Sequence, residues 1–196
     1  MLGEDVQWVS ISDFKDMAEI KEDGATFAEN ARKKALGYAK QTGLWTLADD
    51  SGLVVDALGG EPGVKSARFS GFSPQRRKDT KRKKDERRVT SDERRIIDHK
   101  NMAKVLNLLE GVPKDKRTAR FVCCLCLASP EKVLIETEGT LEGIIAEKEA
   151  GENGFGYDPI FFVPRPKKTV AQLTREEKNA ISHRGNAIRK LLKLTD

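Results

Sequence analysis

The chain has 196 residues, of which 38% are hydrophobic and 34% are charged, and its formal net charge at pH 7 is +5. A chain of this length is expected to form a single domain, residues 1–196, with a core of its own. No apolar run approaches the roughly 20 residues that a membrane-spanning helix needs. No signal peptide opens the sequence, so we expect a cytoplasmic protein.

The positive charge is concentrated in one segment. Residues 72–100 contain 12 Lys/Arg against 6 Asp/Glu, whereas all other residues together contain 24 against 25. Residues 76–88 have no apolar face, which predicts a mobile, solvated surface loop. The same charges could instead bind the phosphates of a nucleic acid. Because no aromatic residues are interleaved for base stacking, we favour the loop.

Strand and helix patterns alternate from the start of the chain. We expect a short strand at residues 6–11 and a helix over residues 26–42. The helix carries Phe27, Ala31, Ala35 and Ala39 along one stripe, which is the spacing of a buried helical face. Gly43 follows it and is a typical residue to end a helix.

Residues 45–53, Trp-Thr-Leu-Ala-Asp-Asp-Ser-Gly-Leu, carry the strongest chemical signal. An apolar run leads into Asp49 and Asp50, and a second apolar run follows Gly52. Because Asp, Ser and Gly favour turns, we predict a strand that ends in a tight acidic corner, with a new strand after it. Adjacent carboxylates there would suit Mg²⁺, which takes oxygen ligands and binds between carboxylates and substrate phosphates. The alternative is a solvated Asp-Ser-Gly turn.

The second half of the chain continues the alternation. We expect a helix at 101–109, strands at 120–128, 133–135, 141–146 and 160–163, and two closing helices, the last with Ile188, Leu191 and Leu192 at helical spacing. Cys123 should face one side of its strand, and Cys124 and Cys126 the other. We interpret all three as buried core thiols, since zinc-ligand spacing is absent. Strands interleaved with helices predict an α/β domain with a mixed sheet.

Three further motifs accompany the acidic corner: residues 57–69 (Ala-Leu-Gly-Gly-Glu-Pro-Gly-Val-Lys-Ser-Ala-Arg-Phe), residues 151–162 (Gly-Glu-Asn-Gly-Phe-Gly-Tyr-Asp-Pro-Ile-Phe-Phe) and residues 182–186 (Ser-His-Arg-Gly-Asn). In this order they resemble the inosine-triphosphate pyrophosphatase family, the non-canonical purine nucleoside-triphosphate pyrophosphatases. The resemblance runs from about residue 5 to the C-terminus and is interrupted by the basic insertion 72–100. It implies an elongated mixed β-sheet flanked by helices, two lobes with a nucleotide cleft between them, and a homodimer.

The resemblance also implies roles for individual carboxylates. Asp50 would be the general base and a Mg²⁺ ligand, and Asp49 would support it or bind the metal itself. Glu29 would complete the metal site. From the residues alone, Glu29 instead fits a capping box with Thr26, in which its carboxylate would bind the start of its own helix.

The remaining predicted site residues would contact the substrate. Phe155 would offer a stacking face to a purine, and Gly156 would let the backbone approach the base edge. His183 and Arg184, at a helix start with Ser182 as N-cap, would donate to a 6-oxo purine. The full set of expected substrate contacts is Ser51, Arg68, Phe155, Gly156, Tyr157, Asp158, Lys178, His183 and Arg184.

The N-terminus departs from the family pattern. Relatives begin with a strand and a phosphate-binding loop of the form Thr/Ser-x-Asn-x-x-Lys, and nothing like it occurs here, so we expect a misassigned start or a truncated copy. The function we predict is Mg²⁺-dependent hydrolysis of ITP, dITP and XTP to the monophosphate and pyrophosphate. The alternative is an inactive truncated homologue that binds nucleotides or polyanions through its basic insertion.

Overall fold

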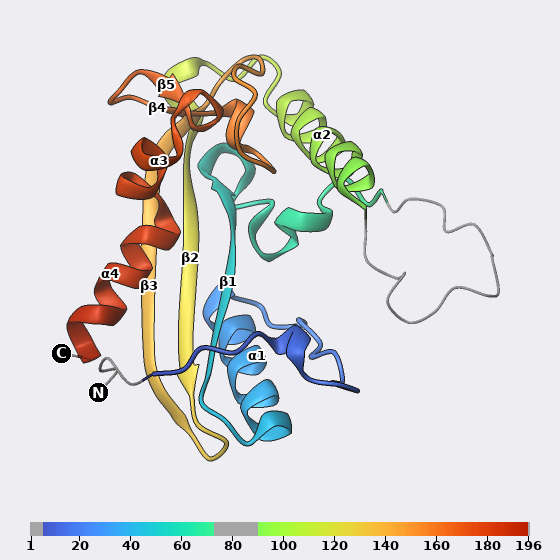
Figure 1. Cartoon of the computed structure of the whole chain (residues 1–196). Coiled ribbons are helices and arrows are strands. Elements are labelled where there is room, and N and C mark those ends of the chain that lie inside the picture. Colours follow the sequence, from blue (N-terminus) through green and yellow to red (C-terminus); the bar gives the residue numbers. More distant parts are fainter. Residues whose placement is uncertain (1–5, 73–89, 196) are drawn as a thin grey trace. The chain divides into compact units, whose positions relative to one another are not determined.

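The computed structural model describes residues 6–72 and 90–195, and within them the chain forms one five-stranded sheet with α-helices packed on it (Figure 1). The strand order is β1-β2-β3-β4-β5. The strands are β1 (Thr46–Val55), β2 (Thr118–Ala128), β3 (Val133–Ile145), β4 (Phe161–Val163) and β5 (Lys168–Thr169). The α-helices are α1 (Phe27–Thr42), α2 (Ser91–Leu108), α3 (Arg175–Ile181) and α4 (His183–Thr195).

The α/β class is as predicted, but the sheet is antiparallel and not mixed. Strand β4 pairs antiparallel with both β3 and β5. A tight turn joins β2 to β3, in which the Ser129 amide donates to the Lys132 carbonyl at 2.9 Å. Short connections of this kind can only reverse the chain, whereas parallel neighbours need a long crossover.

The chain divides into two compact units. The first comprises residues 1–52, 120–141 and 175–196, and the second comprises residues 53–119 and 142–174. Strands β1, β2 and β3 contribute residues to both. None of the helices in the described part of the chain combines the length and apolar character of a membrane span.

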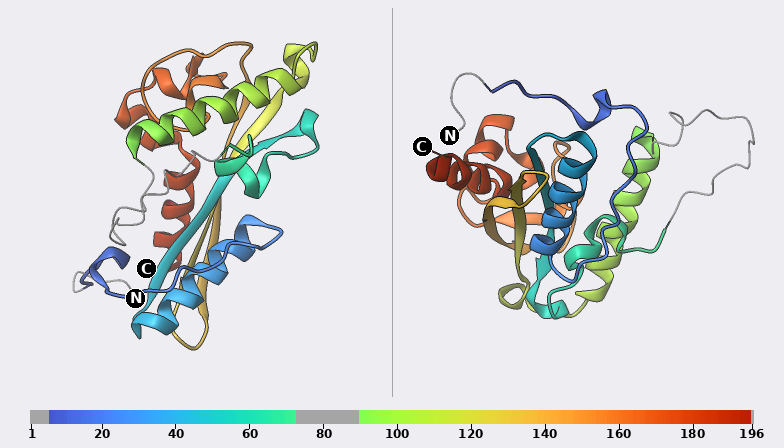
Figure 2. Two further views of the ribbon diagram at one scale, coloured as in Figure 1. Left: turned by 90° about the vertical axis from the view of Figure 1, so that its right-hand side faces the viewer. Right: turned by 90° about the horizontal axis from the view of Figure 1, so that it is seen from below.

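In the first unit, helices α1 and α4 cover opposite faces of the strands (Figure 2). On the α4 side, a buried cluster joins Cys123 and Leu125 of β2 to Ala187 and Leu191 of the helix. Helix α1 buries Ala31, Ala35 and Ala39, as its stripe predicted. The small alanine side chains let the helix approach the sheet closely.

The boundaries of α1 also agree with the sequence. The Thr26 hydroxyl accepts from the Glu29 amide at the N-terminus, and Gly43 ends the helix with φ at +72°. Only glycine adopts that left-handed conformation without cost, which is why the helix ends there.

Two predicted breaks between strands are wrong. Strand β1 runs unbroken through Asp49 and Asp50, so the predicted acidic corner is the middle of a strand. Strand β3 likewise joins the two separate strands predicted at 133–135 and 141–146. In both cases partners in the folded chain outweigh the local preference of polar residues and glycine for turns.

The strand predicted at residues 6–11 is absent. Residues 6–10 have no regular structure, and a short 3₁₀ helix, η1, occupies Ile11–Asp13. Trp8 is 67% exposed and Val9 is 49% exposed. Alternating apolar residues predict a strand only where a neighbouring strand pairs with it, and in the described residues the sheet contains no strand from this segment.

In the second unit, helix α2 begins ten residues before the predicted start at residue 101. Thr90 and Glu93 form a capping box, and Ile97, Met102 and Val105 are buried along one face. Residues 91–100 of the predicted basic insertion are therefore helix. The loop predicted at 76–88, with its possible nucleic-acid contacts, lies outside the described residues.

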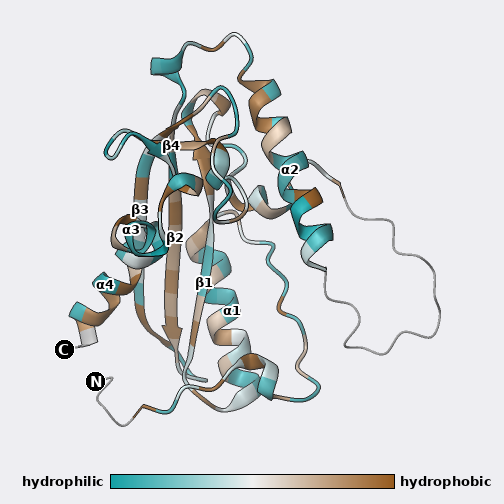
Figure 3. Cartoon of the chain, turned by 45° about the horizontal axis from the view of Figure 1, so that its top comes forward, coloured by the Kyte–Doolittle hydropathy of each residue, from teal (hydrophilic) through white to brown (hydrophobic). Residues whose placement is uncertain are grey.

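The three cysteines are buried and unpaired by disulfides, as predicted. They lie in β2, whose side chains are buried from Phe121 to Ala128 and which is mostly hydrophobic along its length (Figure 3). Burial raises the pKa of Cys123 and Cys124 to about 12 and that of Cys126 to about 11. Neutral thiols of this kind act as small core residues.

Candidate active site

The acidic segment of β1 turns its side chains to two different helices. Arg184 of α4 donates from Nε to Asp49 at 3.1 Å and from its terminal nitrogen to Ser51 at 2.8 Å. Asp50, between them in sequence, points to α1. This division follows from the two-residue period of a strand. The predicted residues Asp49, Ser51 and Arg184 are thus brought together, and Asp50 lies on the other face.

The Asp50 carboxylate is held at both oxygens by α1. Asn30 Nδ2 donates to Oδ2 at 3.1 Å, and Lys34 Nζ donates to Oδ1 at 3.1 Å. Lys34 also binds Glu22 at 2.9 Å, so its ammonium group lies between two carboxylates. The side chains of Asp50 and Lys34 are only 13% and 17% exposed. The carboxylate is therefore in a partly desolvated, polar setting.

Burial raises the pKa of the Asp50 carboxyl, although the Lys34 charge and the hydrogen bonds from Lys34 and Asn30 oppose the shift. For Lys34, burial lowers the pKa, but Glu22 and Asp50 outweigh it and the net direction is upward. A carboxylate with a raised pKa is a better proton acceptor than a fully solvated one. Lys34 stays a fixed positive charge beside it.

Glu29 lies at the exposed start of α1. Its carboxylate accepts from the Ala25 amide at 2.7 Å while its own amide donates to Thr26 at 3.1 Å. These are bonds of the helix-capping kind that the sequence offered as the alternative to metal binding. Within residues 6–72 and 90–195, no group of three or more His, Cys, Asp or Glu side chains is arranged to hold a metal ion. A metal role for Glu29 stays a prediction.

His183 begins α4 and is buried against the sheet. Its ring stacks on Phe121 of β2, with the centroids 5.0 Å apart and the planes at 22°. Burial, reinforced by the charges of Arg184 and Lys178, lowers the pKa of His183 to about 4. Among the described residues, no hydrogen-bond partner reaches its Nδ1. The imidazole is therefore neutral at physiological pH.

The start of α4 is set by two neighbours. Ser182 accepts from the Gly185 amide at 3.1 Å, which confirms the predicted N-cap. On the sheet side, Gly139 of β3 lies so close that a Cβ atom there would be 2.2 Å from the His183 carbonyl oxygen. Lys178 is half-buried in α3, where its carbonyl accepts from the Ser182 amide at 2.8 Å. The positions of His183 and Arg184 are thus fixed by the Ser182 cap, by the close approach of Gly139 and by the junction between α3 and α4.

The glycine-rich loop in the second unit exposes one aromatic ring and buries another. Phe155 is 61% exposed, so it does not fill the core. Tyr157 is 5% exposed, and its hydroxyl donates to the Ser66 carbonyl at 2.8 Å. The buried Asp158 carboxylate accepts from the Phe155 amide at 2.9 Å. Tyr157 and Asp158 therefore shape the loop, and Phe155 lies largely at its surface.

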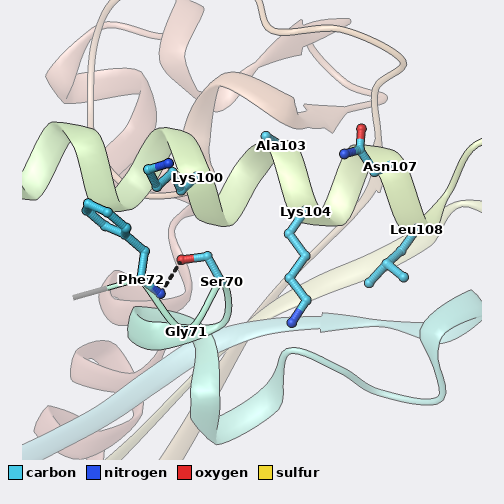
Figure 4. Close-up of a pocket in the computed structure, with 8 residues that line it drawn as sticks. All are labelled: Ser70, Gly71, Phe72, Lys100, Ala103, Lys104, Asn107 and Leu108. Carbon is cyan, nitrogen blue, oxygen red and sulfur yellow. Dashed lines mark hydrogen bonds between the residues drawn. The ribbon is translucent and has the colours of Figure 1, made fainter. Parts of the chain in front are cut away.

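Gly156 and Arg68 complete the predicted residues of the second unit. The Gly156 amide donates to Asp98 of α2 at 2.9 Å, and its φ of +62° is one that glycine adopts freely. Arg68 is exposed at the last turn of a 3₁₀ helix, η3 (Gly63–Arg68). A nearby pocket of about 560 Å³ lies between the residues after η3 and helix α2 (Figure 4). Its lining contains none of the predicted site residues: Ser70, Gly71, Phe72, Lys100, Ala103, Lys104, Asn107 and Leu108.

Several residues around the site were not predicted from the sequence. Asn30, Lys34 and Glu22 surround Asp50, and Phe121 supports His183. One signal was available, because Asn30 directly precedes Ala31 at the edge of an apolar stripe and lies four residues before Lys34. Polar residues one turn apart beside a buried stripe are candidates for a shared partner. The sequence contains nothing that identifies Asp50 as that partner.

Comparison with known proteins identifies close relatives. A family model described as the Ham1 family matches residues 1–194. The chain is 50% identical over 188 residues to the dITP/XTP pyrophosphatase of Desulforamulus reducens, which covers 96% of this chain and 83% of that protein. It is 48% identical over 189 residues to the dITP/XTP pyrophosphatase of Bacillus cereus, covering 95% and 82%.

Solved structures show the same relationship. The Ham1 protein of Staphylococcus aureus superposes with a TM-score of 0.78 at 40% identity, covering 95% of this chain and 85% of that one. The nucleoside-triphosphatase, or dITP/XTP pyrophosphatase, of Mycobacterium abscessus gives a TM-score of 0.75 at 41% identity, covering 98% and 87%.

Proposed function

The chain belongs to the Ham1 family, and on this premise we propose that it hydrolyses dITP, ITP and XTP to the monophosphate and pyrophosphate. This activity would remove non-canonical purine nucleotides from the pool. The observation that carries the proposal is the Asp50 carboxylate, partly desolvated and held at both oxygens by α1. It occurs in a chain half identical to a dITP/XTP pyrophosphatase.

Asp50 acts as the general base in this proposal. A water molecule loses a proton to the carboxylate as its oxygen bonds to the α-phosphorus, and the bond from that phosphorus to the pyrophosphate leaving group breaks. Orientation of the water and electrostatic stabilisation of the phosphates supply most of the rate in such reactions. Lys34 contributes a fixed positive charge next to the base.

In this proposal, donors of the first unit recognise the purine base. Arg184 is a permanent donor, and the neutral His183 keeps a ring N–H that can donate. A 6-oxo purine presents an acceptor to such groups, whereas the amino group of adenine does not. On the family resemblance, Phe155 would stack on the purine, and the residue is 61% exposed. The remaining predicted contacts, Ser51, Arg68, Gly156, Tyr157, Asp158 and Lys178, are proposed as substrate-binding residues on the family resemblance.

Mg²⁺ is proposed as the cofactor, with Asp50 as its protein ligand. A magnesium ion usually takes one or two carboxylates and completes its shell with water and substrate phosphates, so a pre-built three-ligand cluster is not required. The ion would neutralise charge developing on the phosphates. Glu29 could join it while keeping the bond from the Ala25 amide, since one hydrogen bond leaves a carboxylate with lone pairs for a cation. Asp49 would first have to turn, because its side chain lies on the face of β1 opposite to Asp50.

Replacement of Asp50 by Asn tests the proposal. We expect kcat for dITP to fall by about 10²- to 10⁴-fold, the range for loss of a general base, with little change in melting temperature. The matched control is Asp56→Asn, since Asp56 accepts from Thr118 at 2.7 Å and is not among the proposed site residues. Full activity of Asp50→Asn in pyrophosphate-release assays would exclude Asp50 as the base. Activity that survives EDTA would exclude the metal.

The family resemblance further leads us to propose a homodimer that acts in the cytoplasm. Sedimentation velocity at several protein concentrations tests the first point: one species of twice the chain mass is expected, and a species of single-chain mass at all concentrations would refute it. Fractionation of the host cell tests the second.

A further inference from the structure

Asn30 is a buried residue whose side-chain oxygen and nitrogen both form hydrogen bonds. The residue is 1% exposed. Its Oδ1 accepts from the Gly24 amide at 2.8 Å, and its Nδ2 donates to Asp50 Oδ2 at 3.1 Å. One side chain thus links the segment before α1 to the carboxylate on β1.

The surroundings explain why the residue is an amide. A buried polar group costs free energy unless its hydrogen bonds are made, and Asn30 makes one as donor and one as acceptor. A leucine of similar shape would make neither. Gly24 is part of the same arrangement, because a Cβ atom there would lie 2.7 Å from Asn30 Oδ1. The backbone has to come this close for the bond to form.

The contact complements that of Lys34. Lys34 holds Asp50 Oδ1 through its charge, and Asn30 holds Oδ2 through a neutral donor. Two donors on different oxygens restrain the rotation of the carboxylate plane, which a single donor leaves free. Each oxygen still has a lone pair for water or a metal ion. Asn30 is anchored by the Gly24 backbone, whereas Lys34 sits on a long flexible stem.

We propose that Asn30 is a positioning residue that orients the Asp50 carboxylate for proton transfer. This inference rests on the proposed function, in which Asp50 is the base. Asn30 touches neither substrate nor metal in this account and acts only through Asp50. The competing explanation is that Asn30 merely ties the segment around Gly24 to the helix.

Asn30→Leu separates the two explanations, because it keeps the side-chain shape and removes both bonds. We expect kcat for dITP to fall about 10- to 100-fold, the cost of a misplaced catalytic group, with KM within about twofold of the wild type. Asn101→Leu is the matched control. Asn101 is 2% exposed, accepts from the Ser70 amide and donates to the Ser66 carbonyl. It should lower the melting temperature and leave kcat unchanged. Equal losses of kcat in the two variants would overturn the proposal.

An exchange of partners provides a second test that holds even if Asn30→Leu does not fold. In the double variant Asn30→Asp with Asp50→Asn, the donor and acceptor trade places and the hydrogen bond persists. Its melting temperature should exceed that of Asn30→Asp alone, without recovery of activity. A double variant no more stable than that single variant would mean that the contact is not made. If the wild-type chain releases no pyrophosphate from dITP, the proposed function fails. If Asp50→Asn stays active, Asp50 is not the base and this inference fails with that role. If only Asn30→Leu stays active, this inference alone fails.

Discussion

Phe121 of β2 and His183 of α4 lie face to face, with ring centroids 5.0 Å apart and ring planes 22° from parallel. The stack covers one face of the imidazole and helps to exclude water from it. Two cations, Arg184 and Lys178, add to the effect of burial in lowering the pKa of His183, and Asp49 opposes them. The stack on Phe121 therefore fixes the position of the imidazole ring, and the lowered pKa keeps this ring neutral.

The first prediction concerns pH. The folded-state pKa of His183 is about 4 and its ordinary value is 6.5. Between these values the unfolded chain binds more protons, so stability is complete above about pH 6.5 and falls as the pH drops towards 4. The loss attributable to His183 is at most about 3 kcal/mol. Urea unfolding at pH 7, 5.5 and 4.5 should show a shallower decline for His183→Gln, and parallel curves for the two proteins would refute the assignment.

The second prediction concerns the approach of α4 to the sheet. In Gly139→Ala, the new Cβ atom would meet the His183 carbonyl oxygen at 2.2 Å and the Ala187 amide nitrogen at 2.3 Å. Backbone atoms of a packed helix cannot yield, so we expect a loss of about 1–3 kcal/mol in unfolding free energy and a raised KM for dITP. Gly43→Ala is the control, since its φ of +72° is strained for alanine but the space around it is open. It should lower stability without changing KM.

Sequence patterns predicted the elements whose signal is periodic and local. The stripe of Ala31, Ala35 and Ala39 identified α1, and the apolar run around the cysteines identified β2. The unbroken course of β1 was not predictable, because Asp50 and Gly52 favour turns locally. The segment is extended because β1 pairs with β2, and its side chains contact residues distant in sequence: Asp50 contacts Asn30, and Asp49 and Ser51 contact Arg184.

The site was predictable only in part for the same reason. Family motifs pointed to Asp49, Ser51 and Arg184, which the structure brings together. The supporting residues carry no motif of their own. Asn30 and Phe121 look like ordinary helix and strand residues until their partners are seen, so their roles depend on tertiary geometry that a pattern does not contain.

The third prediction concerns the fork of Arg184. Its two nitrogens bind Asp49 and Ser51 from one rigid planar guanidinium, a geometry that the single ammonium nitrogen of lysine does not reproduce. Since Arg184 and Asp49 are both 42% exposed, Arg184→Lys should change stability by less than about 1 kcal/mol. Its KM for dITP should nonetheless rise about tenfold, the equivalent of one charge-assisted hydrogen bond. Arg189→Lys on the same helix is the control and should leave KM unchanged. An unaltered KM in Arg184→Lys would show that the hydrogen bonds of Arg184 to Asp49 and Ser51 do not contribute to substrate binding.

The last prediction separates stability from catalysis in the second unit. Arg117 is 6% exposed, and its guanidinium donates to three carbonyls, those of Val112 (3.0 Å), Ala146 (3.2 Å) and Leu109 (2.7 Å). In Arg117→Met these buried acceptors lose their donors, and we expect a loss of about 3 kcal/mol in unfolding free energy. The exposed neighbour gives the control: Lys116→Met removes the same charge and should cost no more than about 0.5 kcal/mol. Because no proposed site residue contacts the guanidinium through these bonds, kcat and KM at 25 °C should match the wild type. A changed kcat in a folded Arg117→Met variant would show that the hydrogen bonds of Arg117 affect the active site.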